Sequence, residues 1–269
     1  MFVNDMIKVI ILSIVEGITE FLPISSTGHL ILVNHWIEFK GSFANAFDVI
    51  IQFGAILSVV CLYWKKLNPF SKRKSMRQKR DTMNLWMKVV TAFIPAVILG
   101  LLIGDYLDQL FNPTVVATTL LLGGIAIILL EKRRKFPRIN SIQEMTFRTA
   151  FIIGIIQCLA MVPGTSRSAA TIIGAMLLGA NRQVAAEFSF FLAIPTMAGA
   201  TVYSLMKTGI NITSNQWMLL LVGVIVSFIV ALAVIAFFMK YIKKKDFKVF
   251  GYYRIILGVL ILAYFNFMN

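Results

Sequence analysis

Acidic, hydroxyl and imidazole side chains are concentrated in one short stretch near the amino terminus, residues 16–29, between two apolar runs. Glu16 and Glu20 are four residues apart, so on a helix they lie on one face and can contact one ligand. Two carboxylates cannot face hydrocarbon, so this spacing predicts a polar cavity. There they could hold a divalent cation, or act as one acid and one base. Capping of neighbouring backbone groups is the alternative role.

Hydroxyl residues follow Pro23 in the same stretch, where a second helix would begin. Ser26 and His29 are three residues apart and would share a helix face, and a hydroxyl beside an imidazole is the minimum arrangement for an activated nucleophile. Helix capping by itself would explain Ser25 or Thr27. It would not explain an imidazole in an apolar context, so we predict a chemical role for this stretch.

A second polar stretch, residues 163–168, lies in the other half of the chain and is also flanked by apolar sequence. Its Arg167 is predicted to be the one basic residue deep in a membrane segment, and the planar guanidinium fork suits bidentate contact with a phosphate. A structural salt bridge to Glu16 or Glu20 is the alternative, and the two roles are compatible.

Small and hydroxyl residues precede Arg167 and would complete an anion site. Gly164 permits close approach of the backbone, and Thr165 and Ser166 add donors at a helix amino terminus. Two such helix termini, meeting from opposite sides, would direct backbone N–H groups at an anion. Together the two polar stretches predict a buried site that recognises, and transfers, a phosphoryl group.

The composition places this site in a membrane. The chain has 269 residues, of which 58% are hydrophobic and 14% are charged, with a mean hydropathy of +0.82. A soluble domain carries roughly a quarter charged residues, so we predict an integral membrane protein that acts on a lipid phosphate or diphosphate. Cys61 and Cys158 lie in apolar runs and predict neither a disulfide framework nor a zinc site. Residues 1–15 lack the features of a cleaved signal peptide.

Basic residues account for the net charge of +14, and their distribution argues against nucleic acid as a partner. Twenty of the 26 Lys and Arg residues fall in three short segments that we predict to be loops between apolar runs, residues 65–80, 132–148 and 240–254. This is the positive-inside pattern of membrane proteins. It predicts contact with anionic lipid headgroups on the cytoplasmic side.

Six apolar segments approach the roughly 20 residues that a helix needs to cross a bilayer. They are residues 44–64, 85–104, 114–130, 185–206, 216–239 and 251–267. Pro95 and Pro195 lie inside two of these segments and predict kinks, which membrane helices tolerate.

Four shorter apolar pieces form two pairs, each joined at a proline. The pairs are residues 6–22 with 25–37, joined at Pro23, and residues 149–162 with 165–178, joined at Pro163. Each piece is too short to span the hydrocarbon core. Broken helices at membrane depth survive only when they are buried in protein or line a polar cavity, so we predict two re-entrant helical hairpins.

Charge bias then predicts the topology. If the basic segments are cytoplasmic, the first hairpin enters from outside and the second from inside. Opposed hairpins imply an inverted repeat within one polytopic domain, residues 1–269, with halves at about 1–131 and 148–269; residues 22–26 align with 162–166. The predicted fold is an all-α integral membrane protein of about six transmembrane helices plus two re-entrant helical hairpins in an inverted-topology repeat. Its site would lie near the midplane between the halves.

Transporters also use inverted repeats with broken helices, so a transporter or flippase of a polyprenyl phosphate or diphosphate is the alternative function. A transporter has no need of a serine and a histidine three residues apart, and this favours an enzyme.

Two long motifs resemble a known family. Residues 16–29 match E-G-x-T-E-F-x-P-x-S-S-T-G-H, and residues 163–172 match P-G-x-S-R-S-x-x-T-I. With a third segment at residues 47–54, the chain closely resembles, over its whole length, the undecaprenyl-diphosphate phosphatase (bacitracin-resistance) family of bacterial membrane enzymes. Ala169 stands where a glycine is expected in many members, a departure that removes no reactive group.

This resemblance implies hydrolysis of undecaprenyl diphosphate to undecaprenyl phosphate and phosphate, which recycles a carrier lipid for cell-wall synthesis and confers bacitracin resistance. It implies a divalent cation, Mg²⁺ or Ca²⁺, and a multi-pass protein of the bacterial plasma membrane with an extracytoplasmic active site; a homo-oligomer is left open. By residue it implies Ser26 as the nucleophile, with His29 and Glu20 in proton transfer. Glu16 and Glu20 would bind the metal or orient water. Arg167 would clamp the diphosphate with the help of Thr27, Thr165 and Ser166. Ser25 and Gly164 complete the predicted substrate-binding residues.

Overall fold

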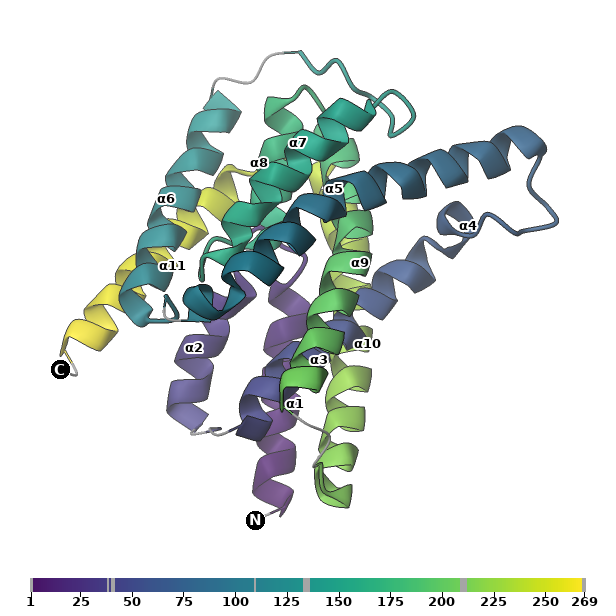
Figure 1. The fold of residues 1–269 in the computed structure, drawn as a ribbon. Coiled ribbons are helices and arrows are strands. Elements are labelled where there is room, and N and C mark those ends of the chain that lie inside the picture. Colours follow the sequence, from purple (N-terminus) through teal and green to yellow (C-terminus); the bar gives the residue numbers. More distant parts are fainter. Residues whose placement is uncertain are drawn as a thin grey trace.

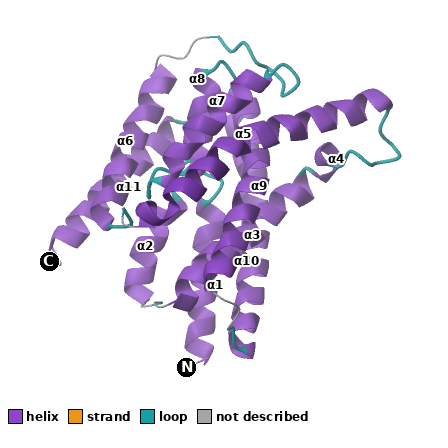
Figure 2. Ribbon diagram, viewed as in Figure 1, coloured by secondary structure: helices purple, strands orange, loops and turns teal. Residues whose placement is uncertain are grey.

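The computed structural model describes residues 2–37, 39, 42–108, 110–132, 136–208 and 212–267. Within these residues all regular secondary structure is helical (Figure 2), apart from one isolated bridge between Ile139 and Ala180. The helices are α1 (Phe2–Thr19), α2 (Ser26–Ile37), α3 (Ser42–Leu62), α4 (Trp64–Leu67), α5 (Met76–Asp108), α6 (Pro113–Lys132), α7 (Phe147–Gln157), the 3₁₀ helix η1 (Cys158–Met161), α8 (Arg167–Leu177), α9 (Arg182–Thr208), α10 (Ser214–Ile242) and α11 (Lys248–Phe267).

Five helices in the described part of the chain are long and apolar enough to cross a membrane. These spans are Met76–Gly104, Pro113–Lys132, Arg182–Tyr203, Ser214–Ile242 and Lys248–Phe267. They confirm five of the six predicted spans. The sixth prediction, residues 44–64, falls on α3, a helix of 21 residues. The chain is therefore an all-α, multi-pass membrane protein.

The spanning helices differ in how much of their surface is covered by protein. In α9, 61% of the most apolar window is buried, whereas in α5, α6, α10 and α11 the share is between 22% and 33%. A helix that is apolar all round is stable where protein or lipid surrounds it. We conclude that α9 is the central helix and that the other four face lipid.

Two helix pairs break inside the molecule, as predicted. α1 ends at Thr19 and α2 begins at Ser26, while η1 follows α7 and α8 begins at Arg167. Below, residues 20–25 are called tip 1 and residues 162–166 are called tip 2. Figure 1 shows both breaks within the bundle rather than at either end.

Corresponding helices in the two halves of the chain make corresponding contacts. α1 packs on α10 as α7 packs on α5, and α2 contacts α11 as α8 contacts α6. α3 also packs against α9, and α6 against α11. The division into halves at about residues 1–131 and 148–269 stays a prediction, which this pairing supports.

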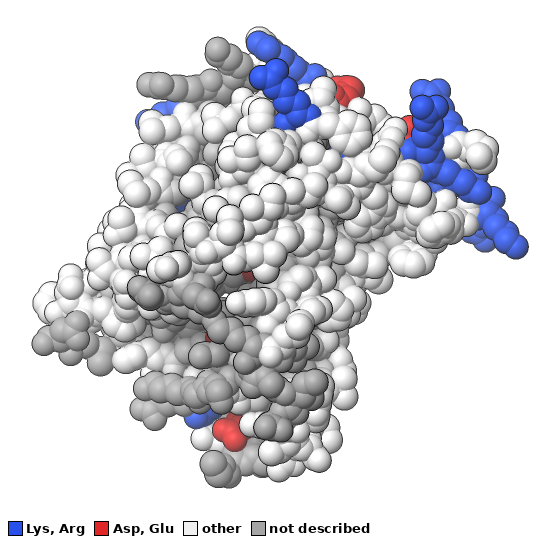
Figure 3. All heavy atoms as spheres, viewed as in Figure 1, with Lys and Arg blue, Asp and Glu red and all other residues white. Residues whose placement is uncertain are grey.

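The basic segments are more helical than predicted. α5 begins at Met76, inside the segment 65–80, and α10 continues to Ile242. Since α5 has 33 residues at about 1.5 Å each, it is longer than a hydrocarbon core of about 30 Å. Its amino-terminal part projects from the body together with α4 (Figure 1). Figure 3 shows Lys and Arg gathered on this projection and at the adjoining end of the molecule, with a nearly uncharged surface beside them.

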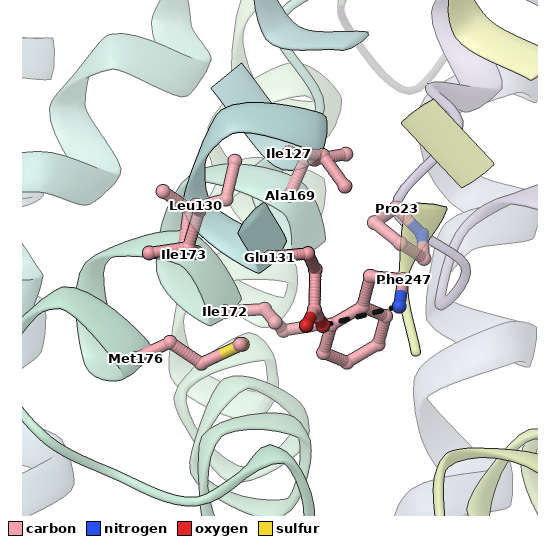
Figure 4. A pocket seen from close by; sticks show the side chains of 9 residues that line it. All are labelled: Pro23, Ile127, Leu130, Glu131, Ala169, Ile172, Ile173, Met176 and Phe247. Atoms are coloured by element: carbon pink, nitrogen blue, oxygen red, sulfur yellow. Dashed lines mark hydrogen bonds between the residues drawn. The ribbon is translucent and has the colours of Figure 1, made fainter. Parts of the chain in front are cut away.

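A buried ion pair lies near this basic end of the molecule. Arg182 Nε and Nη2 donate to the two carboxylate oxygens of Glu131 at 2.9 and 2.6 Å, and Phe247 N donates to Glu131 Oε1 at 3.1 Å. Figure 4 shows the Glu131 carboxylate among apolar side chains, beside a hollow of about 10 Å³ that Pro23 of tip 1 also lines. Such a volume has room for about one water molecule. The bundle is therefore tightly packed between tip 1 and the basic end.

Candidate active site at the two broken helices

The helices after the two breaks start from the same backbone conformation. Ser25 precedes α2 with φ of 72°, and Ser166 precedes α8 with φ of 71°. Left-handed backbone costs a residue other than glycine about 1–3 kcal/mol. Each serine also caps its helix, because Ser25 Oγ accepts from Gly28 N at 3.3 Å and Ser166 Oγ accepts from Ala169 N at 3.2 Å. Ser25 thus corresponds to Ser166, one position away from the alignment that the sequence predicts.

The first residue of each helix supplies different chemistry. Ser26 begins α2 and Arg167 begins α8, and both contact the carboxylate of Glu20 in tip 1. Ser26 Oγ donates to Oε2 at 2.8 Å, and Arg167 Nε and Nη2 donate to Oε1 at 3.4 Å. The Glu20 and Arg167 side chains are only 8% and 10% exposed, so their attraction acts away from bulk water. The structure confirms that the two polar stretches come together.

Arg167 is positioned by α9 and by tip 1. Its Nη1 donates to Ser189 O at 2.9 Å, and its guanidinium lies 5.8 Å from the centre of the Phe21 ring. The predicted salt bridge to Glu20 is present, but its 3.4 Å contacts are longer than the about 2.7–2.9 Å of strong charge-assisted bonds. Arg167 can therefore still bind an anion while the pair keeps its fork in place.

Glu16 lies one helical turn before Glu20 and is fully buried. Neither of its carboxylate oxygens has a hydrogen-bond partner among the described residues. The charges of Glu20, Asp48 and Arg167 all act on it. Burying a charged carboxylate without a partner is costly. We therefore expect that a cation or a proton neutralises the Glu16 carboxylate.

The donor set at this position fits a divalent cation shared with a substrate. Within the described ranges, no three His, Cys, Asp or Glu side chains converge as a metal site. Glu16 and Glu20 would then be the protein's ligands, with water and phosphate oxygens completing the shell. Mg²⁺ is commonly bound in this way, by one or two carboxylates together with substrate phosphates.

His29 has partners other than Ser26. Its Nδ1 lies 2.7 Å from Ser25 O, an acceptor, so we assign the ring proton to Nδ1. Its Nε2 then accepts from Tyr253 Oη at 2.6 Å, and the two rings stack with centroids 5.5 Å apart. The predicted pairing of Ser26 with His29 is therefore wrong for this structure: Ser26 turns toward Glu20, and His29 turns toward α11.

Arg254 joins both tips, and the sequence analysis did not single it out. It is fully buried in α11. Its Nη1 donates to Pro23 O at 3.4 Å, and its Nη2 donates to Gly164 O and Thr165 O, each at 3.1 Å. One guanidinium thus holds carbonyls of tip 1 and tip 2 at a fixed separation.

The same side chain also reaches α6, where it donates to Thr119 O at 3.1 Å and Leu120 O at 3.4 Å. The prediction that Arg167 is the one basic residue deep in a membrane segment is therefore wrong. In the sequence, Arg254 is the last residue of the basic segment 240–254, so it was grouped with the other charges of that segment. Its position four residues into the apolar segment 251–267 was the signal that could have identified it.

Short polar contacts lock the tips to each other and to α6. Ser168 Oγ donates to Leu22 O at 2.8 Å, and Thr119 Oγ1 donates to Pro163 O at 2.7 Å. Gly164 has φ of 85°, and a Cβ there would collide with the Thr119 side chain. The structure thus shows that Gly164 lets the backbone approach α6, while the predicted approach to an anion stays a prediction.

Two further hydroxyl residues of the predicted site lie close in sequence to the starts of α2 and α8. Thr27 lies in the first turn of α2, and Thr165 directly precedes the Ser166 cap. Both are half-buried, and their side chains form no hydrogen bond within the part of the chain that the structure describes. Their hydroxyl donors therefore stay available for a ligand.

Comparison with known proteins gives consistent matches along the chain. Residues 9–260 match the protein family described as bacitracin resistance protein BacA. The chain is 54% identical to undecaprenyl-diphosphatase 1 of Clostridioides difficile (strain 630), over 97% of this chain and 96% of the relative. It is 52% identical to the undecaprenyl-diphosphatases of Desulfitobacterium hafniense, over 97% and 96%, and of Lactiplantibacillus plantarum, over 98% and 99%. The likeness thus extends over nearly the full length of each protein.

Proposed function

The chain belongs to the BacA family of bacitracin resistance proteins, and from this premise we propose that it hydrolyses undecaprenyl diphosphate to undecaprenyl phosphate and inorganic phosphate. One observation carries the proposal: Ser26 and Arg167, the first residues of the helices that follow the two tips, contact the same Glu20 carboxylate. This contact supports Ser26 as the nucleophile, Glu20 as the proton acceptor and Arg167 as the phosphate ligand. The product is the carrier lipid for cell-wall synthesis, and loss of the diphosphate removes the target of bacitracin.

The diphosphate binds between the two tips. Arg167 contributes its planar fork, and the helix amino termini at Ser26 and Arg167 contribute backbone N–H groups and the positive ends of their dipoles. Thr27 and Thr165 add hydroxyl donors. The isoprenoid chain stays in the lipid around the bundle, because the helices that face outward are apolar.

In the first step Ser26 Oγ attacks the terminal phosphorus. A Ser26 O–P bond forms, the P–O bond to the bridging oxygen breaks, and undecaprenyl phosphate leaves with that oxygen. The serine proton passes to Glu20 Oε2, which is 2.8 Å away. Arg167 neutralises the charge that builds on the phosphate oxygens.

In the second step water attacks the phosphoserine. The new bond to phosphorus forms as the Ser26 O–P bond breaks, and Glu20 returns its proton to Ser26 Oγ. The water proton leaves with inorganic phosphate. Glu20 is thus the proton acceptor in one step and the donor in the next, which suits a carboxyl that one hydrogen bond ties to the nucleophile.

His29 acts as a positioning residue. Its Nδ1 holds the carbonyl of Ser25, the residue directly before the nucleophile, and Tyr253 fixes the ring from α11. A direct share in proton transfer, which the family resemblance implies, would require the ring to leave Tyr253.

Glu16 and Glu20 would hold a divalent cation, Mg²⁺ or Ca²⁺. The two buried Glu16 oxygens without partners support this assignment. When bound, the cation supplies charge neutralisation for the phosphoryl group that is transferred.

We place the protein in the bacterial plasma membrane with its site open to the extracytoplasmic side. The Lys and Arg residues gather at one end of the bundle (Figure 3), which the positive-inside rule assigns to the cytoplasm. The buried pair of Glu131 with Arg182 is packed between that end and tip 1. Partners are the lipid substrate and surrounding membrane lipids, and a homo-oligomer stays a prediction.

Phosphate release from undecaprenyl diphosphate by the full chain in detergent micelles tests this function. We expect release that a chelator abolishes and that added Mg²⁺ or Ca²⁺ restores. Movement of intact substrate across proteoliposomes without any cleavage would instead support a transporter or flippase, which the phosphatase names of the relatives do not favour.

A further inference from the structure

A second candidate site lies far from the two tips, on the part of the chain that projects from the bundle (Figure 1). Residues 64–82, called the basic arm here, comprise α4, the following loop and the first turns of α5. Together with Leu85, Ile142 and Gln143 they line an open hollow of about 730 Å³. Small-molecule sites usually have volumes of about 300–1,000 Å³, so the hollow is large enough for a lipid headgroup.

Cations dominate the walls of this hollow, where one carboxylate, Asp81, accompanies five basic side chains. The five are Lys65, Lys66, Lys72, Arg73 and Lys74. Figure 3 shows how densely the Lys and Arg side chains cover the arm. Clustered like charges repel one another, so this arrangement favours an anionic occupant.

Three of the cations are available to a ligand. Lys66 is paired with Glu187 of α9 at 2.5 Å, and Lys74 Nζ donates to Thr82 Oγ1 at 2.7 Å. In contrast, the side chains of Lys65, Lys72 and Arg73 form no hydrogen bond or ion pair within the described residues. Three positive charges that line the hollow thus form no ion pair with a described residue.

Apolar side chains are exposed on the same arm. Trp64, Phe70 and Met76 are 57%, 83% and 80% exposed. Aromatic residues next to Lys and Arg are typical of the water–lipid interface, where the rings enter the headgroup layer and the cations contact phosphate. Since the arm leads directly into the apolar part of α5, which crosses the membrane, the arm lies at the membrane surface rather than in bulk water.

We propose that the hollow of the basic arm binds the phosphodiester headgroup of an anionic phospholipid from the leaflet next to the basic segments. Lys65, Lys72 and Arg73 contact the phosphate, while Trp64 and Phe70 lie among the acyl chains beside it. This site is separate from the catalytic tips, and it does not depend on the phosphatase activity.

Native mass spectrometry of the full chain in non-ionic detergent tests the proposal, with phosphatidylglycerol and phosphatidylcholine of the same acyl chains as probes. We expect phosphatidylglycerol to bind at least about tenfold more tightly, since each nearby Lys or Arg contributes about 1 kcal/mol toward an anionic lipid surface. Equal binding of the two lipids would overturn the proposal. Displacement of the lipid by an equal concentration of inorganic phosphate would overturn it too, because the ligand would then be a free anion.

A matched pair of variants locates the binding. Lys72→Gln with Arg73→Gln removes two charges that line the hollow, whereas Arg77→Gln with Arg80→Gln removes two charges from the same arm outside it. The first double variant should weaken phosphatidylglycerol binding at least about tenfold, and the second less than about threefold. Equal losses would show unspecific attraction to a basic surface and would overturn the site. All four residues lie on the surface arm, so phosphate release from undecaprenyl diphosphate should persist in both and reports that the bundle is folded.

Discussion

Tip 1 and tip 2 end in the same backbone conformation but lead into helices whose first residues have different chemistry. Each places a serine in left-handed conformation, with φ of 72° and 71°, and that serine caps the helix that follows. The next residue is Ser26 in one and Arg167 in the other, and both reach Glu20. One architecture, used twice, thus presents a nucleophile from one side and a cation from the other.

This comparison separates the residues that shape the site from those that react in it. The capping serines, Gly164 and Arg254 set the backbone of the tips. Ser26, Glu20 and Arg167 lie at the junction that the backbone creates. Variants of the first group should change stability, and variants of the second should change activity in a protein that is still folded.

The largest effect is expected at Ser26. Ser26→Ala removes the attacking oxygen, so phosphate release from undecaprenyl diphosphate should fall by at least about 10³-fold, as it does when other nucleophilic enzymes lose their serine. Thr91→Ala is the control, because its hydroxyl bonds only to Met87 O on an outer helix, and it should keep normal turnover. Near-normal turnover of the Ser26→Ala variant would show that Ser26 is not the nucleophile.

The second-largest effect is expected for Arg167→Lys. The lysine keeps the charge but not the fork, so kcat/KM should fall about 10²-fold or more through lost bidentate contact. The protein should remain folded, since the 3.4 Å contacts of Arg167 with Glu20 are weak. If kcat/KM is retained while the unfolding midpoint drops, Arg167 belongs to the structural group instead.

A variant of Arg254 tests whether both tips depend on this one side chain for their stability. Arg254→Met should lower the free energy of unfolding by about 2–4 kcal/mol, because the loop carbonyls of Pro23, Gly164 and Thr165 lose their buried donor. Unfolding in detergent micelles, followed by tryptophan fluorescence, measures the change. Arg254→Lys should recover part of the loss. A loss of activity with full stability would mean that Arg254 contacts substrate rather than backbone.

The smallest effects are expected at the two capping serines, and they test how similar the two tips are. Ser25→Ala and Ser166→Ala each remove one helix cap, which costs about 1 kcal/mol. Both serines accept one backbone N–H at nearly the same distance, but Ser166 Oγ also lies 3.0 Å from Ser168 Oγ, so the two losses should agree within about 1 kcal/mol in the same unfolding assay. A difference of more than about 1 kcal/mol would show that the tips are not equivalent.

Much of this arrangement could be predicted from sequence. Charged and hydroxyl residues between apolar runs identified Glu16, Glu20, Ser26 and Arg167, and the prolines between short apolar pieces predicted both breaks. Residues close in sequence are enough to predict such features, because the length of an apolar run and the presence of a charge within it are both local properties of the sequence.

Contacts between distant elements could not be predicted in this way. Arg254 and Tyr253 reach the tips from α11, and neither contact leaves a periodic signal near residues 16–29. The same limit explains the wrong pairing of Ser26 with His29, since helical spacing alone does not tell which neighbour each side chain faces. The one-residue shift between Ser25 and Ser166 arises from backbone conformation, which an alignment of side-chain types does not record.

The central claim is that Ser26 forms a bond to phosphorus while the opposite tip holds the phosphate. The stereochemical course of hydrolysis tests it most directly, using undecaprenyl diphosphate made chiral at its terminal phosphorus with sulfur and oxygen isotopes. Two successive in-line displacements, through phosphoserine, predict overall retention of configuration. Inversion would mean that water attacks the substrate directly, and it would contradict this account.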